Sequence, residues 1–151
     1  MRCSQRGRKI LKVREGWRPS AYIDSGGKPT IGWGFTAYED GTPVSLSDHP
    51  ITLERGEQLL SWYLDSIEQA IAGLVRQPLN QNQFDALCIF VYNVGVTQFA
   101  QSTLLKRINV NPFHTDIPRQ FMRWVYDNGE VVPGLMKRRS VELRLYHEPV
   151  Q

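Results

Sequence analysis

Apolar residues recur at helical spacing through the middle of the chain. One stripe of aliphatic side chains predicts a long helix over residues 52–76: Leu53, Leu60, Leu64, Ile67, Ile71 and Leu74. Pro78 ends this pattern, and the more continuously apolar segment from Gln81 to Val94 predicts a second helix closed by Gly95. We expect this second helix to form the core of a helical lobe.

Shorter amphipathic segments lie on both sides of these two helices. Residues 4–14 place apolar side chains among good helix formers, which predicts a first helix that begins at Ser4 and ends near Glu15 and Gly16. Toward the C-terminus we expect a helix from Ser102 to Ile108, one from Asp116 that includes Phe121, Trp124 and Val125, a turn at residues 127–129, and a last helix from Leu135 to Tyr146.

Residues 17–35 have a different pattern. Tyr22 to Asp24 and Thr30 to Trp33 flank a Gly-rich segment, Ser25 to Lys28, which predicts a β-hairpin. If five residues form the turn, Asp24 and Thr30 become direct cross-strand neighbours. Gly32 and Gly34 alternate with Trp33 and Phe35, so a strand continuing to Phe35 would have one almost bare face, suited to a polymer passing close to the backbone.

Composition indicates one ordinary globular domain. The chain has 151 residues, of which 41% are hydrophobic and 22% charged. A net charge of +3 and a pI near 9.0 favour approach to anionic polymers, including bacterial cell wall. Basic residues are dispersed apart from Lys137-Arg138-Arg139, so we expect no nucleic-acid partner.

Potential metal ligands are scattered. Cys3 and Cys88 have no metal-ligand spacing, and His49, His114 and His147 lie far apart, so we expect no metal and no cofactor. The basic N-terminus lacks the apolar run of a signal peptide, and the longest apolar stretch, residues 86–91, is far below the roughly 20 residues that span a bilayer. We therefore expect synthesis in the cytoplasm and no stable membrane insertion.

Candidate chemistry is concentrated in the segment EGWRPSAYIDSGGKPTIGWGF, which contains Glu15, Asp24 and Thr30. Glycoside hydrolysis needs one carboxylic acid to protonate the leaving oxygen and one carboxylate to activate water or attack carbon. The negative end of a helix dipole disfavours an ionised carboxylate, which suits Glu15 to the acid role. Taken singly, each residue also has an ordinary interpretation: a helix end, a turn initiator and a strand threonine.

The surrounding motifs make the pattern specific. Glu15-Gly16, Tyr22-x-Asp24 and Thr30-Ile31-Gly32-x-Gly34 are followed in order by Gln83-Phe84-Asp85-Ala86-Leu87, Tyr92-Asn93-Val94-Gly95, Ser102-Thr103-Leu104-Leu105, Gly134-Leu135, Arg138-Arg139 and Glu142. Over nearly its whole length the chain resembles glycoside hydrolase family 24, the phage-type lysozymes or endolysins. One departure is Trp33-Gly34-Phe35, where members often have Tyr-Gly-His, so any bond made by that histidine is absent.

The resemblance implies a lysozyme-like α+β fold that is mainly helical. A small N-terminal β-hairpin lobe, residues 15–51, would be joined by the long helix of residues 52–76 to a helical C-terminal lobe. That larger lobe would comprise residues 77–151 packed with the helix of residues 4–14.

The resemblance also implies hydrolysis of the β-1,4 bond between N-acetylmuramic acid and N-acetylglucosamine in bacterial peptidoglycan. Glu15 would be the acid and Asp24 the general base, with the Thr30 hydroxyl holding the attacking water, which predicts inversion at the anomeric carbon. Tyr92, Asn93 and Ser102 would contact the glycan. Core packing for Tyr92 and helix capping for Ser102 are the alternative roles.

As a phage or prophage endolysin, the protein would act as a monomer on the cell wall in the periplasm, and a holin-type membrane protein would have to open the inner membrane. Two alternatives stay open. A lytic transglycosylase would cleave the same bond with one glutamate and leave a 1,6-anhydro product. A non-catalytic wall-binding relative would bind peptidoglycan without turnover.

Overall fold

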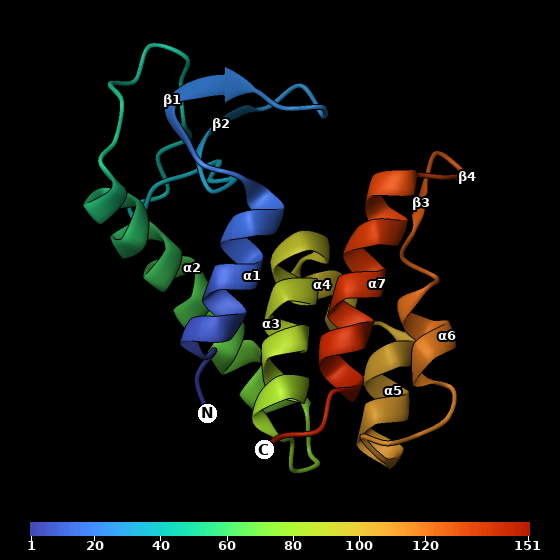
Figure 1. Cartoon of the computed structure of the whole chain (residues 1–151). Helices are drawn as coiled ribbons and strands as arrows, with labels where there is room; N and C mark the ends of the chain where they lie inside the picture. The colour runs from blue at the N-terminus through green and yellow to red at the C-terminus, as the bar shows by residue number, and fades with distance from the viewer. The chain divides into compact units, whose positions relative to one another are not determined.

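A computed structural model describes residues 1–151 and has the expected α+β composition, dominated by helices (Figure 1). The helices are α1 (Gln5–Glu15), α2 (Leu53–Leu74), α3 (Gln81–Val94), α4 (Val96–Ala100), α5 (Thr103–Val110), α6 (Ile117–Phe121) and α7 (Pro133–His147). The strands are β1 (Arg18–Ile23), β2 (Pro29–Gly32), β3 (Tyr126–Asp127) and β4 (Glu130–Val131), in two antiparallel pairs. The predicted fold class is confirmed.

The chain divides into two compact units. One comprises Lys9–Asp65, and the other comprises Met1–Arg8 together with Ser66–Gln151. Both divisions fall inside helices, α1 and α2, rather than between elements. The predicted lobe boundaries and the linking role of residues 52–76 stay predictions.

The unit of Lys9–Asp65 has an aromatic core beside the β1–β2 hairpin. Trp17 and Trp33 lie with ring centroids 4.5 Å apart, and Phe35 stacks on Tyr63 at 5.2 Å. Gly56 of α2 allows the close approach of Trp17, because a Cβ built at Gly56 would lie 2.5 Å from that indole ring. Rings carry much of the buried apolar area of this small unit.

The chain from Gly32 to Gly34 differs from the sequence prediction. The strand does not continue to Phe35; instead Ile31 and Phe35 exchange both backbone hydrogen bonds at 2.9 Å around a tight turn. Gly32 and Gly34 have φ of +66° and +80°, in the left-handed region where a side chain is strained. These glycines therefore reverse the chain, and the expected bare strand face does not form.

The unit containing Ser66–Gln151 is built around α3, whose residues from Asn82 to Val91 are all buried. Asn80 and Gln83 form a reciprocal capping box that fixes the start of α3, and Gly95 closes its end. The Phe90 ring contacts three other rings edge-on or tilted, those of Phe99, Phe121 and Trp124. Helices α3 and α7 pack side by side (Figure 1).

A buried ion pair joins residues one turn apart in α7. Arg139 and Glu142 are 0% and 1% exposed, and their side chains meet at 2.8 Å. A second guanidinium nitrogen of Arg139 donates to the Asn93 side chain at 2.6 Å. Burial lowers the pKa of Arg139, and the Glu142 carboxylate opposes that shift. Removing one partner of such a pair leaves an uncompensated buried charge, which is strongly destabilising.

Two C-terminal features differ from the prediction. Helix α4 was missed, and α6 ends at Phe121, so Trp124 and Val125 lie outside it. Trp124 and Val125 lie in the turn after α6, where the Val125 carbonyl accepts a hydrogen bond from the Val132 amide. The apolar spacing of these two residues therefore reflects packing from a turn and not a continued helix. The expected turn at residues 127–129 is present, with Asn128 and Gly129 at positive φ between the short strands β3 and β4.

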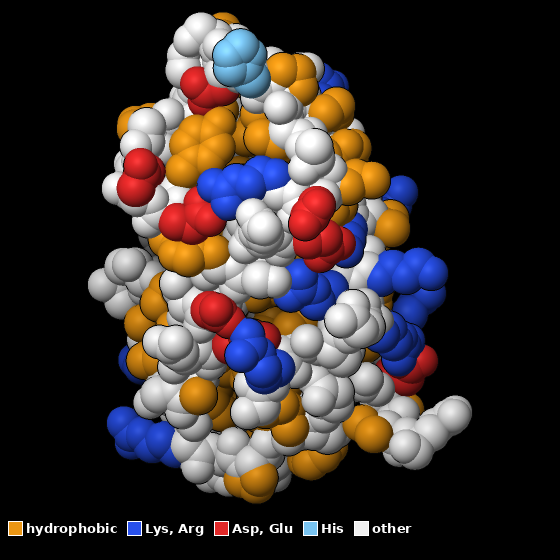
Figure 2. All heavy atoms as spheres, turned by 90° about the vertical axis from the view of Figure 1, so that its left-hand side faces the viewer, with side chains coloured by type: hydrophobic (Ala, Val, Ile, Leu, Met, Phe, Trp, Pro, Cys, Tyr) orange, Lys and Arg blue, Asp and Glu red, His pale blue; other side chains and the backbone are white.

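The N-terminal residues are tied to buried carboxylates. The amide of Cys3 donates to Glu68 at 2.6 Å, and the amide of Ser4 donates to Asp85 at 2.9 Å. Both cysteines are buried free thiols. Acidic and basic side chains are interspersed on the face shown in Figure 2, with no continuous basic field. No helix is long and apolar enough to cross a membrane.

Candidate active site

Glu15 is the last residue of α1, as the sequence predicted. Gly16 follows with φ of +72°, and its amide donates to the Lys12 carbonyl at 2.9 Å, which closes the helix. The Glu15 side chain is half-buried. Its carboxyl therefore lies at the C-terminal end of α1, the negative end of the helix dipole.

The Glu15 carboxyl packs against the tight turn after β2. A Cβ built at Gly34 would lie 3.1 Å from Oε2 of Glu15 and 3.5 Å from its Cδ. The absence of a side chain at position 34 thus leaves the space that the carboxyl uses.

Asp24 organises the loop of the hairpin. Its Oδ1 accepts the backbone N–H groups of Gly26 and Lys28 at 2.9 and 2.8 Å. Its backbone N–H also donates to the Lys28 carbonyl at 2.9 Å. These two bonds give Oδ1 the structural role of an Asx turn and leave Oδ2 to bind a water molecule.

Thr30 lies close to Asp24, although not in the predicted register. Tyr22 is opposite Thr30, and the bond between Asp24 and Lys28 places those two residues opposite each other. Asp24 and Thr30 are therefore diagonal neighbours, whose Cα atoms are typically roughly 7–8 Å apart. The prediction of a direct cross-strand pair is wrong because the turn closes at Lys28 rather than at Thr30.

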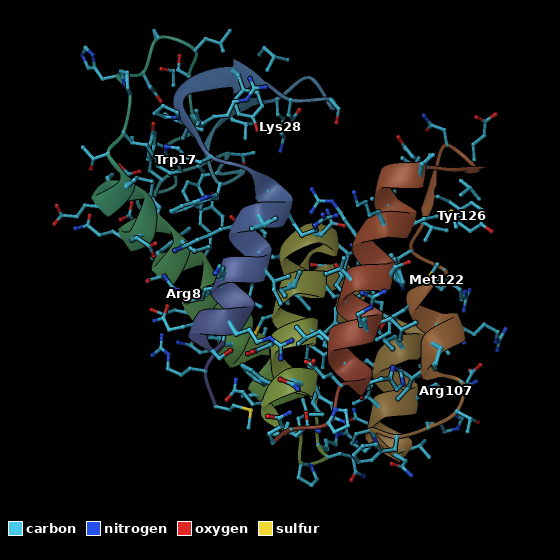
Figure 3. The ribbon with its side chains drawn as sticks, viewed as in Figure 1. Arg8, Trp17, Lys28, Arg107, Met122 and Tyr126 are labelled. Atoms are coloured by element: carbon cyan, nitrogen blue, oxygen red, sulfur yellow. The ribbon has the colours of Figure 1, made fainter.

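The environment of this hairpin is aromatic and weakly basic. Figure 3 shows Trp17 directly after α1 and Lys28 in the hairpin loop. The Lys12 ammonium lies 4.8 Å from the centroid of the Trp33 ring and pairs with Glu57. Phe35, where the family often has histidine, is fully buried, so ring stacking on Tyr63 takes the place of a polar contact.

The predicted glycan contacts Tyr92, Asn93 and Ser102 lie in the other unit. Asn93 is exposed, and its Oδ1 is occupied by Arg139. Ser102 is buried and caps α5: its hydroxyl donates to the Phe99 carbonyl at 2.7 Å and accepts the Leu105 amide at 3.0 Å. The capping role considered for Ser102 is therefore confirmed. Tyr92 is half-buried at the end of α3.

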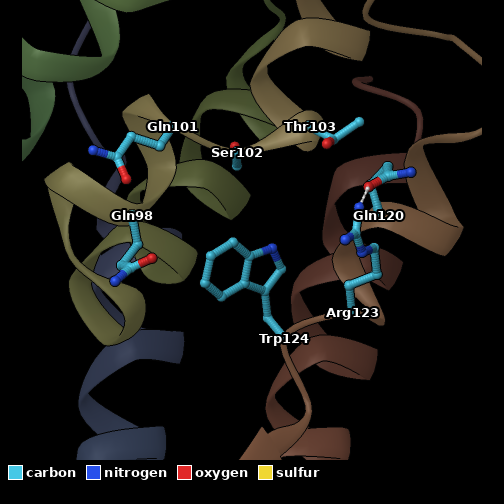
Figure 4. Close-up of a pocket in the computed structure, with 7 residues that line it drawn as sticks. All are labelled: Gln98, Gln101, Ser102, Thr103, Gln120, Arg123 and Trp124. Atoms are coloured by element: carbon cyan, nitrogen blue, oxygen red, sulfur yellow. Dashed lines mark hydrogen bonds between the residues drawn. The ribbon is translucent and has the colours of Figure 1, made fainter.

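Ser102 also lines a polar pocket of about 300 Å³ (Figure 4). The pocket is lined by Gln98, Gln101, Ser102, Thr103, Gln120, Arg123 and Trp124. In Figure 4 the Trp124 ring lies between the two glutamines of the α4 region and the pair formed by Gln120 and Arg123. Arg123 donates to Gln120 at 3.2 Å. No local motif predicted this pocket, because its residues come from two separate stretches of the chain, residues 98–103 and 120–124.

The Gln120 side chain is also bound by Asp116. Asp116 accepts from Arg107 at 2.9 Å, from Arg119 at 2.7 Å and from Gln120 at 2.9 Å. The Arg119 guanidinium is the main cause of a pKa for Asp116 far below its usual range, with Arg107 and Gln120 adding to it. No cluster of three or more potential metal ligands is present.

Comparison with known proteins identifies the family. The family described as phage lysozyme matches residues 12–142, a span that contains Glu15, Asp24 and Thr30. The chain belongs to the phage lysozyme family. The family assignment made from the sequence motifs is confirmed.

Several known proteins are similar to this chain over nearly its whole length. The endolysin of Salmonella phage P22 is 47% identical over 146 residues, which is 97% of this chain and 98% of that protein. Among solved structures, the endolysin from Escherichia coli O157:H7 phage FAHEc1 superposes with a TM-score of 0.88 at 34% identity, covering 99% of this chain and 96% of the other. The muramidase domain of SpmX from Asticaccaulis excentricus has a TM-score of 0.78 at 34% identity, covering 98% and 99%.

Proposed function

We propose that this lysozyme is an endolysin with muramidase activity, hydrolysing the β-1,4 bond between N-acetylmuramic acid and N-acetylglucosamine in bacterial peptidoglycan. The observation that carries the proposal is the arrangement of Glu15 and Asp24 within one compact unit. Glu15 closes a helix and Asp24 organises the hairpin loop. The endolysin and muramidase relatives support the same activity.

Glu15 is the general acid in this proposal. In its protonated form it donates a proton to the glycosidic oxygen as the bond to the anomeric carbon breaks. Gly34 itself adds no side chain beside the carboxyl.

Asp24 is the general base, and Thr30 helps to hold the water. The Thr30 hydroxyl donates its hydrogen to the Lys28 carbonyl at 2.9 Å, so it can only accept a further hydrogen bond. A water molecule could therefore donate one hydrogen to Thr30 and the other to Oδ2 of Asp24. Its lone pair then attacks the anomeric carbon while the proton passes to Asp24, which gives inversion.

Tyr92, Asn93 and Ser102 are the proposed glycan contacts. Oδ1 of Asn93 is committed to Arg139, which leaves its amide nitrogen as the donor for a sugar oxygen. Both hydrogen bonds of the Ser102 hydroxyl serve the backbone, so this residue can offer a ligand only its remaining lone pair. Tyr92 supplies a partly exposed ring at the end of α3 on which a sugar can pack.

The biological setting is part of the proposal. The endolysin is made in the host cytoplasm, reaches the periplasm after a holin-type protein opens the inner membrane, and acts on the wall as a monomer. Neither a metal nor an organic cofactor takes part in the proposed mechanism, since the two carboxyl groups supply both proton transfers.

Mass spectrometry of the fragments released from purified peptidoglycan tests the function. We expect wild-type protein to release fragments with reducing-end N-acetylmuramic acid, and folded Glu15→Gln to release almost none. Fragments with 1,6-anhydro ends would identify a lytic transglycosylase instead. Wall binding by folded wild-type protein without any release would identify a binding protein.

A further inference from the structure

Glycine is required at two positions of the turn after β2, and for different reasons. At Gly32 a built Cβ would lie 2.6 Å from the ring of Phe35, so a side chain there would disturb the aromatic core. At Gly34 the nearest atoms all belong to the Glu15 side chain, at 3.1, 3.5 and 4.0 Å. Position 34 is thus specifically matched to the acid.

The turn that contains Gly34 cannot easily move away from Glu15. Both hydrogen bonds between Ile31 and Phe35 close it, and both of those side chains are fully buried. Trp33, at the tip of the turn, packs on Trp17 and is only 6% exposed. A side chain added at position 34 would therefore displace the carboxyl rather than the backbone.

We propose that Gly34 is a positioning residue for Glu15: the bare backbone at position 34 fixes where the carboxyl lies and keeps it within reach of the glycosidic oxygen. The inference rests on the proposed function, since it assumes that Glu15 is the acid. A general acid acts over hydrogen-bond distances, so even the shift of a few tenths of an ångström that relieves a 3.1 Å contact lengthens its approach to the glycosidic oxygen.

Gly41 provides a matched control for backbone strain. Its φ is +86°, close to the +80° of Gly34, and a Cβ built there meets nothing within 4 Å. Gly34→Ala and Gly41→Ala thus share the cost of a left-handed alanine, but only Gly34→Ala crowds Glu15.

Kinetics on soluble peptidoglycan fragments test the proposal. We expect Gly34→Ala to lower kcat by roughly 3- to 10-fold with KM changed less than about twofold, and Gly41→Ala to keep wild-type values. Folded Gly34→Ala with wild-type kcat would overturn the proposal. A rise in KM at unchanged kcat would overturn it too, because Gly34 would then be a substrate contact.

A second measurement applies even if Gly34→Ala folds poorly. In thermal unfolding, Gly34→Ala should lower Tm more than Gly41→Ala in the wild-type background, and this excess should vanish in a Glu15→Ala background. An excess that persists without the Glu15 side chain would contradict the proposal. Full activity of Glu15→Gln would refute the proposed function itself, whereas inactive Glu15→Gln with fully active Gly34→Ala would refute only the positioning role.

Discussion

The hydroxyl of Thr30 donates to the backbone carbonyl of Lys28 at 2.9 Å, inside the loop that Asp24 organises. In the same loop, Oδ1 of Asp24 accepts hydrogen bonds from the backbone N–H groups of Gly26 and Lys28. The proposed base and the proposed water-holding residue are therefore tied to one short segment of backbone, Asp24 to Thr30.

Thr30→Val should keep the buried shape but remove the oxygen that accepts the hydrogen bond from the water. We expect kcat to fall by about 10²-fold, the scale of a misplaced reactant, with the fold retained. Thr30→Ser keeps the oxygen and should retain most of the activity. Equal activity of the valine and serine variants in a wall-lysis assay would rule out a role for the hydroxyl.

Asp24→Asn should separate the catalytic role of this residue from its structural role. The amide oxygen of asparagine can still accept the N–H groups of Gly26 and Lys28, so Tm should stay close to wild type. Loss of the base should lower kcat by about 10²- to 10⁴-fold. Asp24→Ala should lower Tm as well, because it loses the loop hydrogen bonds. A folded, fully active Asp24→Asn variant would exclude Asp24 as the base.

Much of the fold followed from the sequence because apolar periodicity and capping residues act locally. The predicted bounds of α3 are correct, since Asn80, Gln83 and Gly95 mark both ends in the sequence. The α2 prediction is correct to within two residues at each end.

The errors arose where spacing has more than one structural meaning. Gly32 and Gly34 fit an alternating strand as well as a tight turn, and only the bonds between Ile31 and Phe35 distinguish the two. Likewise, Trp124 has helical spacing from Phe121 but faces the core from a turn, where its ring contacts Phe90.

The candidate site residues show the same contrast between local motifs, which the sequence reveals, and contacts that only the fold brings together. Glu15, Asp24 and Thr30 lie within 16 residues of sequence, so a motif could identify all three. The polar pocket around Trp124 combines residues 98–103, which run from α4 to the start of α5, with residues 120–124, at the end of α6 and in the turn after it, and no local pattern joins them.

Arg139→Ala should be among the most destabilising substitutions in α7. It would leave Glu142, which is 1% exposed, as a buried charge without its partner, at a cost of about 3–5 kcal/mol in the free energy of unfolding. Lys137→Ala, an exposed change in the same helix, is the control and should cost less than about 0.5 kcal/mol. Similar urea midpoints for the two variants would contradict the assigned role of the ion pair.

Asp116 should make stability depend on pH at the acidic end. Its folded-state pKa is lowered by Arg119, Arg107 and Gln120, so the stabilisation is complete above the unfolded pKa of about 3.9 and is lost as the pH falls toward the folded value. Asp116→Asn should therefore lower Tm at pH 6, and its difference from wild type should shrink below about pH 4. A constant difference from pH 6 to pH 2 would show that the charge is not responsible.

Ser102→Ala should weaken the start of α5. Loss of the hydrogen bond to the Leu105 amide should cost about 0.5–2 kcal/mol in the free energy of unfolding, and Ser102→Asp should restore most of it. If Ser102 also contacts the glycan, both variants should raise KM. An unchanged KM in both variants would limit Ser102 to the cap.

In the proposed mechanism, Glu15 protonates the leaving oxygen while Asp24 activates a water on the opposite face of the sugar. Proton NMR of the first products formed from soluble peptidoglycan chains tests it most directly, because it reads the configuration of the new reducing end before mutarotation. Inversion of the β-1,4 bond predicts the α-anomer as the initial product. Initial formation of the β-anomer would contradict the account, since it would require a covalent intermediate in place of a water activated by Asp24.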